Sequence, residues 1–147
     1  MKIFLIVLIV VASSSICYAQ KNLKYLITGS KMNGKDQSYL YQNAGSMIKV
    51  FNEGGKLSMV IEDIPVNVDW VGTLTQSKNK DEERGNTFVK YKNYTFFYCN
   101  RTKNAAGKYR QADVAFILSD RDKSFTCVVI TETEVVEYFG TDITDLH

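Results

Sequence analysis

The stretch MIKVFNEGGKLSMVI, residues 47–61, shows how this chain is organised. Two apolar-rich runs, 47–51 and 56–61, flank the segment NEGG at 52–55. Two glycines between such runs are typical of a β-hairpin, because glycine adopts backbone conformations that tight turns require. The stretch therefore predicts two antiparallel strands joined by a short turn.

The same pattern continues toward the C-terminus. Segments rich in aromatic and β-branched residues are typical of strands. They cover 66–74, 87–99, 109–118 and 125–139, the last as one long strand or two. The polar segments between them are expected to be loops or turns, and they cover 77–86, 100–108 and 119–124. No convincing helix is predicted, although 36–45 could hold one turn or a short helix.

This order of elements predicts one all-β domain of about seven or eight antiparallel strands, as a barrel or a sandwich. Long strands with short reversals favour an up-and-down meander, and closing it into a barrel removes exposed strand edges. The architecture resembles the small secreted ligand-binding barrels of the lipocalin type. The resemblance is in architecture only, because Trp70 is the one tryptophan and no Gly-x-Trp lies near the chain start.

The first residues have the layout of a secretory signal peptide. Lys2 precedes an apolar run from Ile3 to Ala12, which is short for a membrane span, and small and polar residues follow. We expect cleavage after Ala19, which makes 1–19 the signal peptide and 20–147 the all-β domain. The alternative, a lipid-modified Cys17, is less favoured because Ile16 precedes it. The sequence thus predicts a secreted or periplasmic protein with no stable membrane span.

The formal charge of the full chain is only +2. A nearly neutral protein has no broad electrostatic attraction to nucleic acid or to an anionic membrane surface. Nucleic acid is therefore not expected among the partners.

Two cysteines, Cys99 and Cys127, remain beyond the predicted signal, and in an oxidising compartment they suggest a disulfide. A simple meander argues against it, since Cys127 would lie level with about residue 91. The two sulfur atoms would then be on the order of 25 Å apart, whereas a disulfide needs Cα atoms within about 7 Å. We favour the meander with two buried thiols, and the disulfide stays open as the alternative.

The residues offer little support for catalysis. The one histidine is His147, at the chain end, so a catalytic triad or a histidine zinc site is not expected. Glu132 and Glu134 would share one strand face and could act as an acid and base pair, but an exposed polar strand explains them better. DRDKS at 120–124 begins like a calcium loop, which Phe125 then interrupts. We therefore expect no enzyme, no cofactor and no metal site.

Aromatic residues are the most informative feature. Alternation along 88–99 puts one set on a single strand face: Phe88, Lys90, Lys92, Tyr94, Phe96 and Tyr98. Together with Trp70, the residues Tyr94, Phe96 and Tyr98 are the candidate ligand-binding side chains. The competing interpretation is that they pack in the core, with the lysines reaching water.

Asn93 and Asn100 begin Asn-x-Thr patterns, which are glycosylation acceptors only in a eukaryote. The predicted function is an exported, non-enzymatic binding protein that holds a small apolar or aromatic ligand in a barrel or cleft. The alternative is a protein-interaction module, adhesin-like or an enzyme inhibitor, that acts through loops 77–86 and 100–108. A carboxylate-dependent hydrolase around Glu132 and Glu134 is the weakest option.

Overall fold

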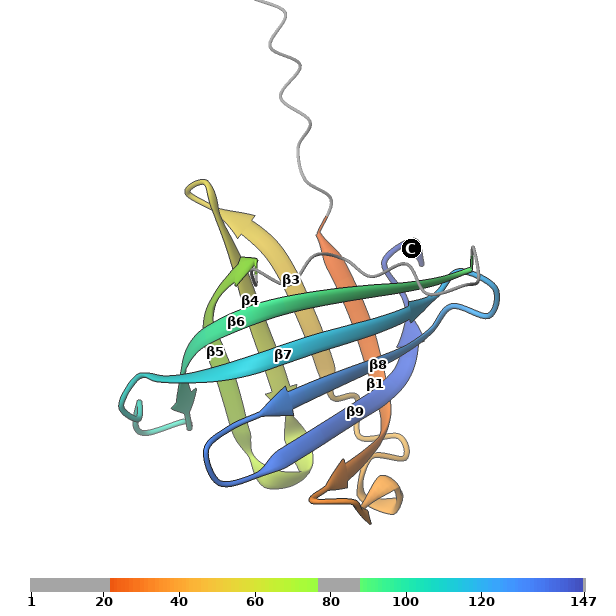
Figure 1. Ribbon diagram of the computed structural model, residues 1–147. Helices are drawn as coiled ribbons and strands as arrows, with labels where there is room; N and C mark the ends of the chain where they lie inside the picture. Colours follow the sequence, from red (N-terminus) through yellow and green to blue (C-terminus); the bar gives the residue numbers. More distant parts are fainter. Residues whose placement is uncertain (1–21, 77–87, 147) are drawn as a thin grey trace, which may run out of the picture.

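Nine β-strands and two short 3-10 turns make up the part of the protein that the structure describes (Figure 1). The computed structural model describes residues 22–76 and 88–146. The strands are β1 (Leu23–Met32), β2 (Lys35–Asp36), β3 (Met47–Glu53), β4 (Lys56–Asp63), β5 (Val68–Gln76), β6 (Val89–Arg101), β7 (Arg110–Ser119), β8 (Ser124–Ile130) and β9 (Val135–Asp142). The 3-10 turns are η1 (Ser38–Leu40) and η2 (Ile64–Val66).

The sheet closes on itself. Consecutive strands from β3 to β9 pair antiparallel, β1 pairs with β3 on one side and β9 on the other, and β2 adds a short edge to β1. The result is a closed, eight-stranded, up-and-down antiparallel barrel plus one extra strand, which confirms the all-β prediction and selects the barrel over the sandwich.

Most of the expected elements are present. The stretch 47–61 is the β3–β4 hairpin, and its Gly54 and Gly55 have φ values of 59° and 78°. The range 125–139 is two strands, β8 and β9, and 36–45 holds the single turn η1. The strand expected from Val66 begins only at Val68, because η2 with Pro65 occupies that joint and Asn67 adopts the left-handed conformation.

Strand β1 was not predicted, yet it is the strand that closes the barrel. Its sequence LKYLITGSKM gives no clean alternation, because the pairing with β9 shifts register between Ile27 and Gly29. Such a β-bulge reverses which residues face the interior and bends the strand. The same irregularity that hides the strand from the sequence therefore helps to curve it.

Two glycines allow the sheet to curl tightly. A Cβ atom at Gly72 of β5 would lie 2.0 Å from the carbonyl oxygen of Phe97, and one at Gly140 of β9 would lie 1.9 Å from that of Leu26. Both neighbours are backbone atoms and cannot move aside without distorting a strand. Glycine at such positions is the usual way in which a sheet bends into a barrel.

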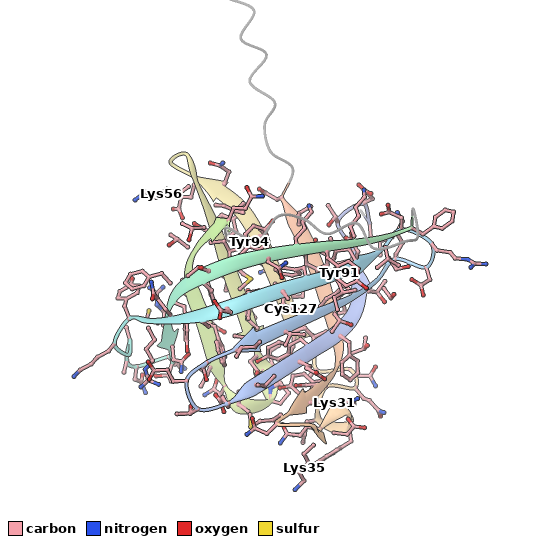
Figure 2. All side chains as sticks on the ribbon, viewed as in Figure 1. Lys31, Lys35, Lys56, Tyr91, Tyr94 and Cys127 are labelled. Carbon is pink, nitrogen blue, oxygen red and sulfur yellow. The ribbon has the colours of Figure 1, made fainter. Side chains whose placement is uncertain are left out.

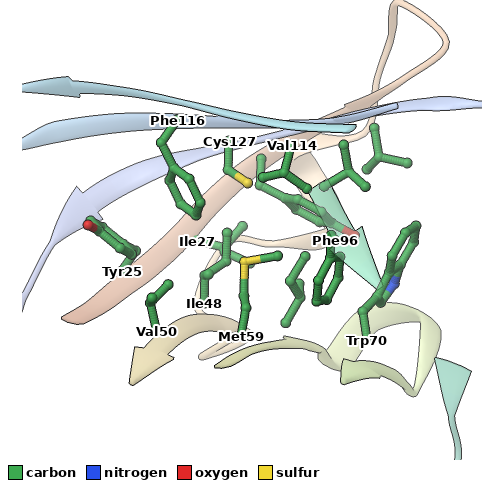
Figure 3. Close-up of a cluster of buried hydrophobic side chains, with 14 of the residues drawn as sticks. Tyr25, Ile27, Ile48, Val50, Met59, Trp70, Phe96, Val114, Phe116 and Cys127 are labelled. Carbon is green, nitrogen blue, oxygen red and sulfur yellow. The ribbon is translucent and has the colours of Figure 1, made fainter. Parts of the chain in front are cut away.

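Apolar and aromatic side chains fill the interior (Figure 3). They alternate with outward-facing residues along each strand, as in Phe125, Cys127 and Val129 of β8. An eight-stranded barrel is just wide enough for side chains to fill it. A stack of three rings lies in this core, with Tyr98 between Trp70 and Phe96 at ring-centre distances of 5.1 and 5.0 Å.

The barrel has two distinct ends. The end that we call the lower end carries the connections 33–46, 64–67, 102–109 and 131–134, and the opposite end carries the β3–β4 and β7–β8 turns. Figure 2 marks these ends with Lys31 and Lys35 below and Lys56 above. Within the described ranges, no helix has the length and apolar content needed to cross a membrane.

Candidate ligand-binding cleft at the lower end of the barrel

One half of the lower end is sealed by a buried cluster that we call the Asp63 cluster, made of Tyr41, Asp63 and Tyr138. The hydroxyl of Tyr41 donates a hydrogen bond to Asp63 Oδ1 at 2.8 Å, and that of Tyr138 donates to Oδ2 at 2.7 Å. All three residues are at most 4% exposed. Each carboxylate oxygen thus has a tyrosine partner, which is how buried polar groups are normally satisfied.

The connection 33–46 carries Tyr41 over this half. Its start is fixed where Asp36 Oδ1 accepts a hydrogen bond from the Ser38 amide at 2.8 Å. Near its other end, the buried Ser46 Oγ accepts one from the Ile64 amide at 3.1 Å, which ties the connection to η2. These local bonds explain why a long connection lies against the barrel and plugs it.

Burial dominates the electrostatics of the Asp63 cluster. It raises the pKa of Asp63 above the ordinary value of 3.8, and the hydrogen bonds from Tyr138 and Tyr41 oppose that rise. The pKa values of Tyr41 and Tyr138 are also raised, first by burial and then by the neighbouring carboxylate. With both carboxylate oxygens hydrogen-bonded and all three side chains buried, the cluster is suited to holding the fold together.

The other half of the lower end is open. Strand β7 begins at Arg110, but its pairing with β8 starts only where Asp113 faces Ile130. Residues 110–112 therefore pair with β6 alone. The gap next to them is a cleft of about 470 Å³ between the β6–β7 connection and the β8–β9 turn, which stand apart at the left of Figure 1.

Aromatic rings form one wall of this cleft, which we call the Tyr98 cleft. Its lining includes Tyr98, Asn100, Tyr109, Arg110, Glu132 and Glu134. Tyr98 is nearly buried at 2% exposed, whereas Tyr109 is 60% exposed. The ring of Tyr109 stacks on that of Phe97, which is 47% exposed, with ring centres 5.0 Å apart and planes at 16°. A flat, exposed pair of rings borders a hollow that reaches the core.

The β8–β9 turn places Glu132 and Glu134 on the opposite wall. Thr131 organises the turn, because its Oγ1 accepts hydrogen bonds from the amides of Thr133 and Glu134 at 3.3 and 3.0 Å. Its amide also donates to the carbonyl oxygen of Glu134 at 2.9 Å. The two glutamates therefore lie in a turn and not on a strand. The alternation expected along a strand does not determine which way their side chains face.

Charges of both signs act on the Tyr98 hydroxyl. Burial raises the pKa of Tyr98, the guanidinium of Arg110 opposes this rise, and the carboxylates of Glu134 and Glu132 add to it. Among the described residues, the ion pairs are Lys49 with Glu62 and Lys90 with Asp120, so none joins Arg110 to either glutamate. The cleft thus presents an aromatic wall together with positive and negative groups not engaged with one another.

The sequence-predicted ligand residues do not form one site. Trp70, Phe96 and Tyr98 come together in the three-ring stack, and within it Tyr98 lines the cleft. Tyr94 lies farther along the barrel, where its ring meets that of Phe116 edge-on at 6.2 Å. Trp70 and Phe96 therefore pack in the core, as the competing interpretation has it. Of the four candidate residues, Tyr98 is the one that lines the cleft.

Cys99 and Cys127 are free, buried thiols. Cys127 pairs in register with Phe116, and Phe116 with Lys92, within one residue of the expected level. Cys127 faces the interior, where burial raises the pKa of its thiol, while alternation puts Cys99 on the opposite face of the wall from Phe96. The meander is confirmed. In this strand order the two cysteines lie too far apart to form a disulfide, and both are free.

The remaining candidate positions are distributed over the barrel. Asn93 is half-buried on the outer face of β6, and Asn100 is exposed beside the Tyr98 cleft. In DRDKS, the side chain of Asp122 accepts hydrogen bonds from the amide and hydroxyl of Ser124, which lower its pKa to about 2, so this segment is a polar hairpin turn. Loop 77–86 lies outside the described residues.

No cluster of His, Cys, Asp and Glu side chains fit to hold a metal ion occurs in the part of the chain that the structure describes. The sequence did not point to Phe97, Tyr109 or Arg110. A signal was available, since a β6–β7 hairpin closed by loop 100–108 places Phe97 and Tyr109 near each other across the two strands.

No protein-family model, no curated protein and no solved structure matches this chain. The barrel and its cleft are therefore the features that bear on function.

Proposed function

We propose that the protein is an exported, non-enzymatic binding protein that takes a small ligand with an apolar or aromatic body in the Tyr98 cleft. Export follows from the predicted signal peptide at 1–19. A β-barrel is compatible with such a role, since barrels commonly hold ligands at their mouths.

One observation carries the proposal, namely an open cleft of about 470 Å³ that aromatic and polar side chains line together. Small-molecule sites are typically concave, about 300–1,000 Å³ in volume, and combine apolar walls with a few placed polar groups. An exposed tyrosine such as Tyr109 offers a flat apolar face and a hydroxyl, which suits it to contact a ligand.

The cleft is a better site than the barrel centre. Phe96, Met59 and Tyr138 are fully buried at 0% exposed, and they belong to one continuous core. A ligand in the centre would have to displace packed side chains, which costs free energy. The Tyr98 cleft needs no such displacement.

A protein partner is the second candidate. The Phe97–Tyr109 pair also borders a hollow of about 380 Å³ on the outer face, which Phe51, Val60 and Val71 line in part. Exposed aromatic residues are enriched in protein interfaces. Tyr109 belongs to the connection between β6 and β7. If the protein is an interaction module, this observation favours loop 100–108 as part of the contact surface.

Titration with small phenyl compounds tests the proposal. Phenylethanol, phenethylamine, phenylpropionate and phenylalanine differ in charge but share one ring. Trp70 is the single tryptophan and stacks on Tyr98, so its fluorescence reports on the cleft. We expect a saturable change with at least one compound, accompanied by a higher melting temperature.

Tyr109→Ala should weaken this binding about tenfold or more, since it removes the exposed ring. Tyr39→Ala is the matched control, because Tyr39 is 72% exposed on η1, away from the cleft. The proposal fails if none of the four compounds binds saturably, or if Tyr39→Ala weakens binding as much as Tyr109→Ala does.

A further inference from the structure

The charged groups of the Tyr98 cleft come from two different elements. Arg110 is the first residue of β7, and Glu132 and Glu134 belong to the β8–β9 turn. All three line the same hollow as Tyr98, and their charges act on its hydroxyl. The positive and negative sides are thus held by separate parts of the backbone and face a shared space.

The two sides do not neutralise each other. No ion pair between Arg110 and the two glutamates occurs within the described residues, and the hydrogen bonds at Glu134 use only its backbone. A guanidinium can hold a carboxylate with two parallel hydrogen bonds, and a carboxylate can accept them from an ammonium group. Arg110 is therefore complementary to a carboxylate group of a ligand, and the two glutamates are complementary to an ammonium group.

We propose that the ligand of the Tyr98 cleft is a small zwitterion with an aromatic body, which has the chemistry of an aromatic amino acid. Its ammonium group binds Glu132 and Glu134, its carboxylate binds Arg110, and its ring lies against Tyr109. This inference rests on the proposed function, because it names the class of ligand for the same cleft.

The arrangement also predicts that a purely apolar ligand binds less well. Such a ligand would remove water from three charged groups and give them no partner, which is unfavourable. A zwitterion replaces that water on both sides. Two carboxylates against one guanidinium leave the lining with an excess of negative charge, so an ammonium group contributes more than a carboxylate group.

The same four phenyl compounds test the inference. Phenylalanine should bind tightest, phenethylamine next, phenylpropionate after it and neutral phenylethanol weakest. Each matched charge should strengthen binding about tenfold, as expected for a charge-assisted hydrogen bond. Measurement by calorimetry at low salt and again at high salt should show the advantage of phenylalanine shrinking as salt screens the charges.

Two variants separate the roles of the walls. Arg110→Gln should weaken phenylalanine and phenylpropionate about tenfold and leave phenethylamine unchanged or slightly tighter. The double variant Glu132→Gln, Glu134→Gln should weaken phenylalanine and phenethylamine and spare phenylpropionate. Arg121→Gln, in the exposed turn between β7 and β8, is the control and should change no affinity.

The outcomes keep the two proposals apart. If all four compounds bind equally well and Tyr109→Ala abolishes their binding, the cleft binds ligands but the zwitterion inference is wrong. Binding of no compound removes the proposed function itself. The order of affinities of the four compounds could also stay the same in Arg110→Gln and in the double glutamine variant. That result overturns the inference, because the charged groups that bind the ligand would then not be Arg110, Glu132 and Glu134.

Discussion

The two halves of the lower end of the barrel hold carboxylates in opposite ways. In the sealed half, Asp63 is 4% exposed and accepts hydrogen bonds from two buried tyrosines. In the open half, Glu132 is exposed, and no ion pair joins it to Arg110 among the described residues. A paired and buried carboxylate supports the fold, whereas an exposed one beside a cleft can serve a ligand.

The length of the connections explains the difference. Residues 33–46 form a long connection that brings Tyr41 across the barrel end. Residues 131–134 form a turn closed by the hydrogen bond between Thr131 and Glu134, and it is too short to cover the interior. One half of the end is therefore plugged by the chain itself, and the other remains a cleft.

Removing the buried carboxylate is the strongest test of this contrast. Asp63→Ala leaves the hydroxyls of Tyr41 and Tyr138 without their acceptor, and each unsatisfied buried group is costly. We expect the free energy of unfolding to fall by about 4 kcal/mol. Chemical denaturation monitored through Trp70 fluorescence measures it.

Glu132→Ala is the matched change in the open half. It should alter the free energy of unfolding by no more than about 0.5 kcal/mol, as is usual for an exposed side chain. Equal losses for the two variants would contradict the division into a sealed half that supports the fold and an open half that does not.

A methyl group at Gly72 should have the next largest effect. Gly72 pairs in register with Tyr98, and the added Cβ atom would press on the backbone at Phe97 and Tyr98. We expect Gly72→Ala to lower the free energy of unfolding by about 3 kcal/mol, as overpacking does. Thermal and chemical unfolding measure the loss, and weaker binding of phenylalanine would show that the inner end of the cleft has moved.

Gly107→Ala is the control for Gly72→Ala. Its added Cβ atom would lie 3.3 Å from the carbonyl oxygen of Asn100, a contact that a small shift relieves. The variant should therefore unfold nearly as the parent does. If Gly72→Ala were as stable as the parent protein, β5 and β6 would have to pack less closely at Gly72 than they do in the structure.

The smallest expected effect is a pH dependence from Asp63. Since its folded-state pKa is raised, the folded protein binds a proton at higher pH than the unfolded chain does. Its contribution to the free energy of unfolding should increase as pH falls through the folded-state pKa toward 3.8, and level off below that value. Denaturation of the parent and of Asp63→Asn at several pH values measures the difference.

The comparison with Asp63→Asn isolates this group from other carboxylates. Asp122, whose pKa is lowered to about 2 by Ser124, acts in the opposite direction and is present in both proteins. A difference between parent and variant that decreases toward acidic pH would mean that the two tyrosine hydrogen bonds outweigh burial at Asp63.

Much of the fold could be predicted from local pattern. The hairpin at 47–61 is visible because its two glycines separate two apolar runs, and β6 to β9 follow from their aromatic and β-branched residues. Strand β1 was missed because its bulge breaks the alternation that identifies strands. The start of β5 was placed two residues early because Val66 fits the alternation of that strand, although it belongs to η2.

The site was less accessible to sequence reasoning. Of the four candidate ligand residues, Tyr98 reaches the cleft, while Trp70 and Phe96 serve as core beneath it. Arg110 had no local feature to mark it. It becomes part of the cleft only because β7 extends beyond β8, and the relative length of neighbouring strands is set by their register.

The sequence by itself determined the class of the fold and the order of most strands, because alternation and turn residues act over a few neighbouring positions. The tertiary structure alone decided that the barrel closes through β1 and β9, that Asp63 meets two tyrosines far apart in the chain, and that a cleft opens beside Tyr98. These features depend on contacts between distant residues, and no local pattern encodes such contacts.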